Sequence, residues 1–217
     1  MTSDSSFVVF LVDDDPGVLK ALQRLLRSKG HEVRAFASST EFLAQHDTSV
    51  RGCAILDVSM PDLDGLKLQA ALTASGAERP VIFVTGVGDI PATVRAMKAG
   101  AIDFLTKPVN SRELLAAIQR AMEIDLKSRE SQKDLELINS RISALTPRER
   151  EVLTHVVAGR LNKQIAAALG IVEKTIKLHR GRMMRKMGVR TIADLVRMAE
   201  RAGIKPPHKE FDRTSRT

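Results

Sequence analysis

Asp57 stands at the end of an apolar run, Cys53–Leu56, and is followed by a loop that contains Pro61 and Gly65. Three other apolar runs also end in polar side chains: Phe7–Val12 before Asp13, Asp14 and Asp15, Val81–Val84 before Thr85, and Ile102–Leu105 before Thr106 and Lys107. Ligands of parallel α/β sheets lie at the carboxyl ends of the strands. The sequence therefore predicts that these polar side chains converge on one point.

The first 125 residues alternate short apolar runs with segments of helical spacing. Asp15 before Pro16 is typical of a helix start, and Ser38 to Glu41 indicates a capping box. We therefore expect an α/β fold with a five-stranded, doubly wound parallel sheet, flavodoxin-like in class. Strands are expected at 7–12, 31–35, 53–57, 81–85 and 102–105, and helices at 16–29, from 38, near 66–74, at 91–99 and from 110.

A helical linker and a second, all-α domain are expected next. Residues 125–143 are charged, contain no proline or glycine, and keep Leu126, Leu135, Ile138 and Ile142 at a loose helical spacing. Four helices at 147–158, 163–169, 173–187 and 192–202 each end at a glycine, and the middle pair forms a helix-turn-helix. The expected domain limits are 6–124, 125–143, 144–205 and a disordered tail, 206–217.

The distribution of charge and the single cysteine limit the classes of function that the chain can have. Residues 144–217 hold 17 Lys and Arg against 7 Asp and Glu, a net of +10, whereas residues 1–126 carry a net of −3. This asymmetry indicates a polyanionic partner for the C-terminal domain alone. The single cysteine, Cys53, excludes an internal disulfide framework, and we expect its thiol to be buried and inert. No apolar run reaches the length of a membrane span, and the start of the chain lacks a signal peptide, so we expect a soluble cytoplasmic protein without a membrane partner.

The acids at the strand ends suit phosphoryl transfer. Mg²⁺ prefers one or two carboxylates together with water and substrate oxygens, and Asp13, Asp14 and Asp57 offer that ligand set. Catalysis is then mostly positioning and electrostatics. We expect Asp57 to be the nucleophile and phosphoacceptor, Lys107 to pair with the phosphoryl group, and Thr85 to donate a hydrogen bond.

The joint spacing of these residues resembles the receiver domain of bacterial two-component response regulators. The resemblance implies that Asp14 binds Mg²⁺ directly, that Asp13 does so largely through water, and that the backbone carbonyl of Ser59 is the remaining protein ligand. It also implies a switch, in which Thr85 moves inward on phosphorylation and the ring of Phe104 takes the vacated space. The competing interpretation is that Phe104 is an ordinary core residue, and one ring can serve both purposes.

Residues 145–153 (LTPREREVL), 162–166 (NKQIA) and 174–179 (KTIKLH) closely resemble the LuxR-type DNA-binding domain, and the chain over about residues 7–204 resembles a FixJ-type response regulator. At 100° per residue, one face of the third helix holds Val172, Ile176, Met183 and Met187, which we expect to pack inward. The outward face holds Lys174, Lys177, Leu178, Gly181 and Arg185.

A recognition helix presents its outward N-terminal residues to base edges in the major groove. Lys177 and Leu178 are therefore expected near bases with Lys174 beside them, although each lysine alone fits a phosphate contact equally well. Further expected DNA contacts are Lys163, Thr175, His179 and Arg182, of which His179 alternatively packs against the scaffold helix. Two departures from the LuxR pattern are Val172, where a Ser or Thr cap is common, and Gly181, where a longer side chain can occur.

The resulting prediction is a transcription factor that a sensor histidine kinase phosphorylates on Asp57. Phosphorylation is expected to promote homodimerisation and binding to promoter DNA, with RNA polymerase as a further partner. No enzymatic activity is expected beyond the receiver's own Mg²⁺-dependent phosphorylation and dephosphorylation. One alternative is a regulator that binds DNA without phosphorylation. A second is a haloacid-dehalogenase-like phosphatase with Asp13 as nucleophile, which would leave Asp57 without a role.

Overall fold

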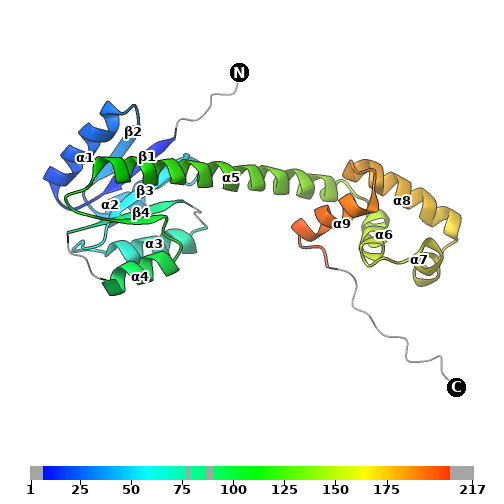
Figure 1. Ribbon diagram of the computed structural model, residues 1–217. Helices are drawn as coiled ribbons and strands as arrows, with labels where there is room; N and C mark the ends of the chain where they lie inside the picture. The colour runs from blue at the N-terminus through cyan, green and yellow to red at the C-terminus, as the bar shows by residue number, and fades with distance from the viewer. Residues whose placement is uncertain (1–6, 77–78, 87–89, 206–217) are drawn as a thin grey trace. The chain divides into compact units, whose positions relative to one another are not determined.

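The computed structural model describes residues 7–76, 79–86 and 90–205, and the tail predicted at 206–217 lies outside them. The chain divides into two compact units, Met1–Arg129 and Glu130–Thr217. Helix α5 (Ser111–Ser143) contributes residues to both units (Figure 1). The predicted helical linker is thus continuous with the last helix of the first unit.

The first unit is built on a five-stranded sheet in the order β2-β1-β3-β4-β5 (Figure 1). The strands are β1 (Val8–Val12), β2 (Glu32–Phe36), β3 (Gly52–Asp57), β4 (Val81–Thr85) and β5 (Asp103–Thr106). Every pairing is parallel, which confirms the predicted fold class. The first, second and fifth strands begin one residue later than the sequence predicts, and the third begins one residue earlier.

Helices cover both faces of this sheet. Helices α1 (Pro16–Ser28) and α5 pack on one face, and α2 (Ser39–Gln45), α3 (Gly65–Ala74) and α4 (Ile90–Lys98) pack on the other. The central strands β1, β3 and β4 are buried along their whole length, which explains their continuous apolar sequences. Cys53 lies in this core, and its burial raises the pKa of the thiol to about 12, as expected for an inert cysteine.

Local signals set the helix starts. Asp15 caps α1 by accepting hydrogen bonds from the backbone N–H groups of Gly17 and Val18. The start of α2 differs slightly from the predicted capping box. Ser38 does accept from the N–H of Glu41, but the Glu41 carboxylate accepts from the N–H of Ala37, one residue before the cap.

The second unit holds the four predicted helices: α6 (Pro147–Val157), α7 (Asn162–Leu169), α8 (Glu173–Met187) and α9 (Ile192–Arg201). The predicted capping box of α6 is formed, with reciprocal hydrogen bonds between Thr146 and Glu149. Ile138 of α5 is buried and Ile142 packs on the core of this unit, while Leu126 and Leu135 remain exposed. The last turns of α5 are therefore part of the second unit.

The predicted inward face of α8 is correct except at its first residue. Ile176, Met183 and Met187 are fully buried, whereas Val172 is 67% exposed. Val172 is the N-cap residue and has extended backbone angles, so the helical phase does not apply to its side chain. Its side chain makes no capping hydrogen bond, as expected for valine at this position.

Candidate functional site

Three carboxylates meet at the carboxyl end of the sheet. Asp13 and Asp14 follow β1, Asp57 ends β3, and one oxygen from each lies within 4.8 Å of the others. Asp13 and Asp57 are 4% and 5% exposed, whereas Asp14 is open to solvent. Like charges this close disfavour ionisation unless a cation balances them. The donor set suits a hard divalent cation such as Mg²⁺.

Lys107 supplies a positive charge to the cluster from the end of β5. Its ammonium lies 2.7 Å from a carboxylate oxygen of Asp13 and 3.0 Å from one of Asp57. Burial raises the pKa of Asp13 above its usual value, and the hydrogen bond from Lys107 opposes this only in part. Burial lowers the pKa of Lys107, but the hydrogen bonds to both acids and the negative charges of these acids together outweigh burial, so the pKa is raised. The ammonium is therefore held charged between the two acids.

The remaining predicted residues of this site lie around the cluster. Thr85 ends β4 and is buried, and its carbonyl accepts from the N–H of Lys107. Ser59 is exposed, and its N–H donates to Asp57 at 3.3 Å. Phe104 is half-buried, with its ring centroid 6.3 Å from that of Phe83. The sheet thus brings the predicted residues to one edge.

The loop after Asp57 is held by residues that sequence reasoning missed. The hydroxyl of Ser39, at the start of α2, donates to the carbonyl of Leu63 at 2.6 Å, and Ser39 is fully buried. The N–H of Thr40 donates to the carboxylate of Asp62 at 3.1 Å. Gly65 packs so closely that a Cβ there would lie 2.2 Å from the carbonyl oxygen of Asp57. The glycine in the sequence was the only local signal of this tight packing.

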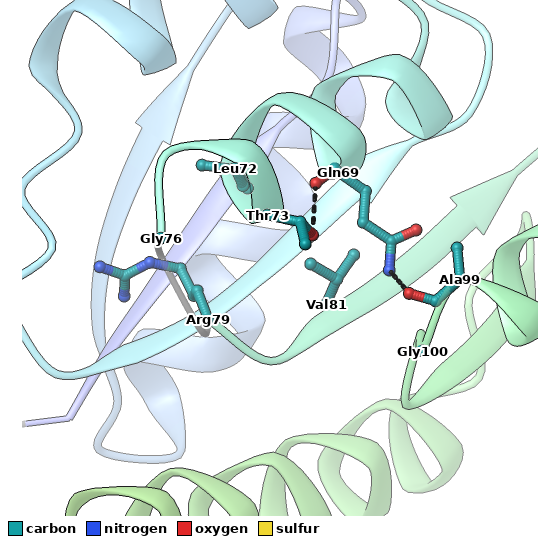
Figure 2. Close-up of a pocket in the computed structure, with 8 residues that line it drawn as sticks. All are labelled: Gln69, Leu72, Thr73, Gly76, Arg79, Val81, Ala99 and Gly100. Atoms are coloured by element: carbon teal, nitrogen blue, oxygen red, sulfur yellow. Dashed lines mark hydrogen bonds between the residues drawn. The ribbon is translucent and has the colours of Figure 1, made fainter. Parts of the chain in front are cut away.

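A separate pocket of about 320 Å³ lies near Val81, the first residue of β4 (Figure 2), and none of the three acids lines it. The amide of Gln69 donates to the carbonyl of Ala99 at 3.1 Å, while the side chain of Arg79 extends away from both (Figure 2). Binding sites require a few convergent polar groups. The polar groups lining this pocket do not converge, in contrast with those of the acidic cluster.

The second candidate site is the exposed surface of α7 and α8. The predicted outward residues of α8, namely Lys174, Lys177, Leu178, Gly181 and Arg185, are all exposed, as are Lys163 and Arg182. Thr175 and His179 are half-buried on the flanks. Lys177 pairs with Glu173 at 3.3 Å. Arg180, which we did not predict, fixes the two helices together by donating to Asn162 at 2.9 Å.

Comparison with known proteins matches both units. Residues 9–119 match the response regulator receiver domain, and residues 143–199 match the bacterial regulatory proteins of the luxR family. The chain belongs to the two-component response regulators. The receiver and LuxR-type resemblances noted in the sequence are thereby confirmed, and this response regulator is of the transcriptional kind.

Individual relatives extend over nearly the whole chain. Nodulation protein W of Bradyrhizobium diazoefficiens is 47% identical over 203 residues, covering 94% of this regulator and 89% of the relative. The low-resolution structure of response regulator StyR is 44% identical with a TM-score of 0.77, covering 90% and 98% of the two chains. Full-length FixJ from B. japonicum is 36% identical with a TM-score of 0.55, covering 92% and 98%.

This family membership implies two classes of partner for the regulator: a histidine kinase for the receiver, and DNA for the LuxR-type domain. Receiver domains bind Mg²⁺ at an acidic pocket, and the three carboxylates form such a pocket. Within the described residues, every helix is too short or too polar to cross a bilayer.

Proposed function

We propose that Asp57 accepts the phosphoryl group of a phosphohistidine on a sensor kinase. A carboxylate oxygen of Asp57 attacks phosphorus, the P–N bond breaks, and the departing imidazole keeps the bonding electrons and takes up a proton. Asp57 suits this role because its carboxylate is buried and lies 3.0 Å from the ammonium of Lys107. The convergence of three acids and one lysine at the end of the sheet is the observation that carries this proposal.

The other residues of the cluster bind and orient. Asp13, Asp14, Asp57 and the backbone carbonyl of Ser59 would hold Mg²⁺, which when bound neutralises the crowded oxygens of acceptor and phosphoryl group. Lys107 exchanges part of its pairing with Asp57 for the phosphoryl oxygens. The resulting phosphoryl charge remains balanced inside a partly buried site, which keeps the aspartyl phosphate bound in one orientation.

The phosphorylation signal then passes to α4 and β5. The hydroxyl of Thr85 moves toward the phosphoryl oxygens, and the half-buried ring of Phe104 follows into the space released. On the exposed side of α4, Val94 and Met97 are each 46% exposed. This apolar surface, rearranged with β5, would form the contact between two phosphorylated receivers, giving a homodimer.

The dimer brings two LuxR-type domains to one promoter. Helix α8 would enter the major groove, with Lys177 and Leu178 near base edges and Lys174 beside them. Lys163, Thr175, His179 and Arg182 would contact phosphates, and Lys174 is placed to do so as well. The net charge of +10 on residues 144–217 supports this assignment, as does the exposure of the α8 cations. At the promoter, the bound dimer would act on RNA polymerase in the cytoplasm.

The decisive experiment measures the mass of the full chain by light scattering, with and without beryllofluoride and Mg²⁺. The wild type should shift from monomer to dimer, and Asp57→Asn should not respond. Asp15→Asn is the matched control, since asparagine also caps helices well and Asp15 is engaged with the start of α1. It should dimerise like the wild type. A response in Asp57→Asn would refute Asp57 as the acceptor, and dimerisation of every variant without beryllofluoride would favour phosphorylation-independent binding.

A further inference from the structure

Gly181 occupies the interior of α8, where nothing within the described protein calls for a glycine. Its φ angle is not positive, and a Cβ added there would meet no atom within 4 Å. Glycine is nevertheless the poorest helix former after proline, since it loses the most backbone freedom on folding. The glycine therefore weakens α8 without any packing benefit inside the protein.

The surroundings of Gly181 indicate what benefits from it. Lys174, Leu178, Gly181 and Arg185 follow one another at i, i+4, i+7 and i+11, which places them in one stripe along the helix. All four are exposed, on the side opposite the buried core residues of α8. Lys174 and Arg185 thus lie on either side of an uncharged step of the stripe, which consists of the 51% exposed Leu178 and of Gly181.

We propose that Gly181 is the point of closest approach between α8 and the DNA, and that it determines sequence specificity by setting how deeply the helix enters the groove. This inference rests on the proposed DNA-binding role of α8. With no side chain at 181, the helix backbone can approach the duplex, and the branched side chain of Leu178 reaches the groove floor. An apolar side chain there recognises the 5-methyl group of thymine.

A thymine contact at this step accounts for the pattern of charge along the stripe. Lys174 and Arg185 can bind phosphates on either side of the groove, where a positive charge is useful for any sequence. The uncharged step between them contributes little to non-specific affinity. Leu178 and Gly181 should therefore affect the affinity for the preferred sequence almost alone, whereas the two cations should affect the affinity for any sequence.

The test uses the full chain activated with beryllofluoride and Mg²⁺. A labelled duplex selected from a random pool by the wild type is compared, by fluorescence anisotropy over a series of salt concentrations, with a scrambled duplex of equal length. Gly181→Ala should bind the selected duplex about tenfold more weakly, the effect of losing one good base contact. Its affinity for the scrambled duplex should stay unchanged, as should its salt slope, the slope of the logarithm of the binding constant against the logarithm of the salt concentration. Its thermal unfolding midpoint should rise.

Two further variants vary the size and the place of the added side chain. Gly181→Leu should lose more affinity for the selected duplex than Gly181→Ala does. Ala193→Leu adds a side chain at an exposed position of α9 and should lose no affinity.

Two outcomes would overturn the inference. One is a Gly181→Ala variant that is more heat-stable yet binds the selected duplex as tightly as the wild type. The other is weaker binding accompanied by a lower thermal midpoint, which would indicate a structural role. Failure of the underlying DNA assignment looks different: Lys174→Ala should lower the salt slope by about one unit, and an unchanged slope would show that α8 does not face DNA.

Discussion

The ammonium of Lys107 lies 2.7 Å from the carboxylate of Asp13, although the two residues come from opposite ends of the receiver sequence. Asp13 is almost fully buried, and that burial raises its pKa despite the ion pair. An acid with a raised pKa in the folded state stabilises the fold below its unfolded pKa of 3.8. That contribution is lost as the pH rises through the folded-state pKa, so the ionised Asp13 carboxylate weakens the metal-free receiver at neutral pH.

Asp13→Asn should therefore raise the free energy of unfolding at neutral pH without Mg²⁺, by about 1 kcal/mol. Saturating Mg²⁺ should reverse the order, because the wild type gains ligand-binding stabilisation and the variant loses a ligand. Urea unfolding followed by circular dichroism provides the measurement, since the chain has no Trp or Tyr. A metal-free variant less stable than the wild type would contradict the argument, and Asp15→Asn should change little under either condition.

Gly65 gives a second prediction, on the contact between the start of α3 and Asp57. A Cβ at this position would lie 2.2 Å from the carbonyl oxygen of Asp57 and 3.1 Å from the ring of Phe83, so the backbone at the end of β3 must shift. Gly65→Ala should lower the free energy of unfolding by about 3 kcal/mol and weaken the beryllofluoride response.

Gly86→Ala is the matched control for this substitution. Gly86 follows Thr85 at the same edge of the sheet, but a Cβ there meets nothing within 4 Å. Its stability should stay within about 0.5 kcal/mol of the wild type. If both variants lost the same free energy of unfolding, the backbone around Gly65 would accommodate a Cβ at little energetic cost.

Much of this fold could be predicted from sequence because its signals are local. The apolar runs of β1, β3 and β4 are buried on both faces, and the caps at Asp15 and Thr146 act within their own helices. The acids stand at strand ends in the sequence, and the carboxyl ends of parallel strands lie together, so these acids must meet at one edge of the sheet. The positions of the acids and of Lys107 followed from this rule alone.

What sequence could not predict depends on contacts between distant segments. The bond from Ser39 to the carbonyl of Leu63 spans 24 residues, and no local pattern announces it. The sharing of Lys107 between two acids depends on how β5 aligns beside β4. The prediction that Val172 packs inward was wrong for another reason. It applied the helical period of 100° per residue to a residue that lies before the first turn of α8.

A third prediction concerns Asp125, which holds α5 to the receiver. Its two carboxylate oxygens each accept from an arginine, Arg51 and Arg129, at 3.1 Å, and the residue is 5% exposed. Removing one partner of a buried ion pair leaves charge without compensation. Asp125→Asn should lower the free energy of unfolding of the receiver by about 2 kcal/mol, measured by urea unfolding or by hydrogen exchange in β1 and β3.

The same substitution further along α5 is the control. The side chain of Asp134 is 62% exposed and pairs with Arg201 at 3.1 Å, an arrangement that contributes little in solvent. Asp134→Asn should change stability by less than about 0.5 kcal/mol. If both variants lost the same free energy of unfolding, burial of the ion pairs of Asp125 would not contribute to stability.

The last prediction concerns Glu149, a carboxylate that is 2% exposed in the core of the DNA-binding domain. Lys186 donates to it at 2.6 Å and the N–H of Thr146 at 2.9 Å, and the bond from Lys186 is the main cause of its lowered pKa. A lowered pKa means that the stabilisation is present above the unfolded value of 4.5 and is lost as the pH falls through the folded-state pKa. Glu149→Gln should therefore cost about 2 kcal/mol at neutral pH, and less on acidification.

Glu151, two residues further along α6, separates this effect from simple loss of negative charge. Its side chain is 51% exposed and pairs with Arg148 at 2.6 Å. Calorimetry of Glu149→Gln, Glu151→Gln and the wild type over a pH series should give a pH-dependent loss for Glu149 alone. A loss for Glu149→Gln that stayed constant through the acid range would show that packing of the side chain, and not its charge, holds α6 to α8.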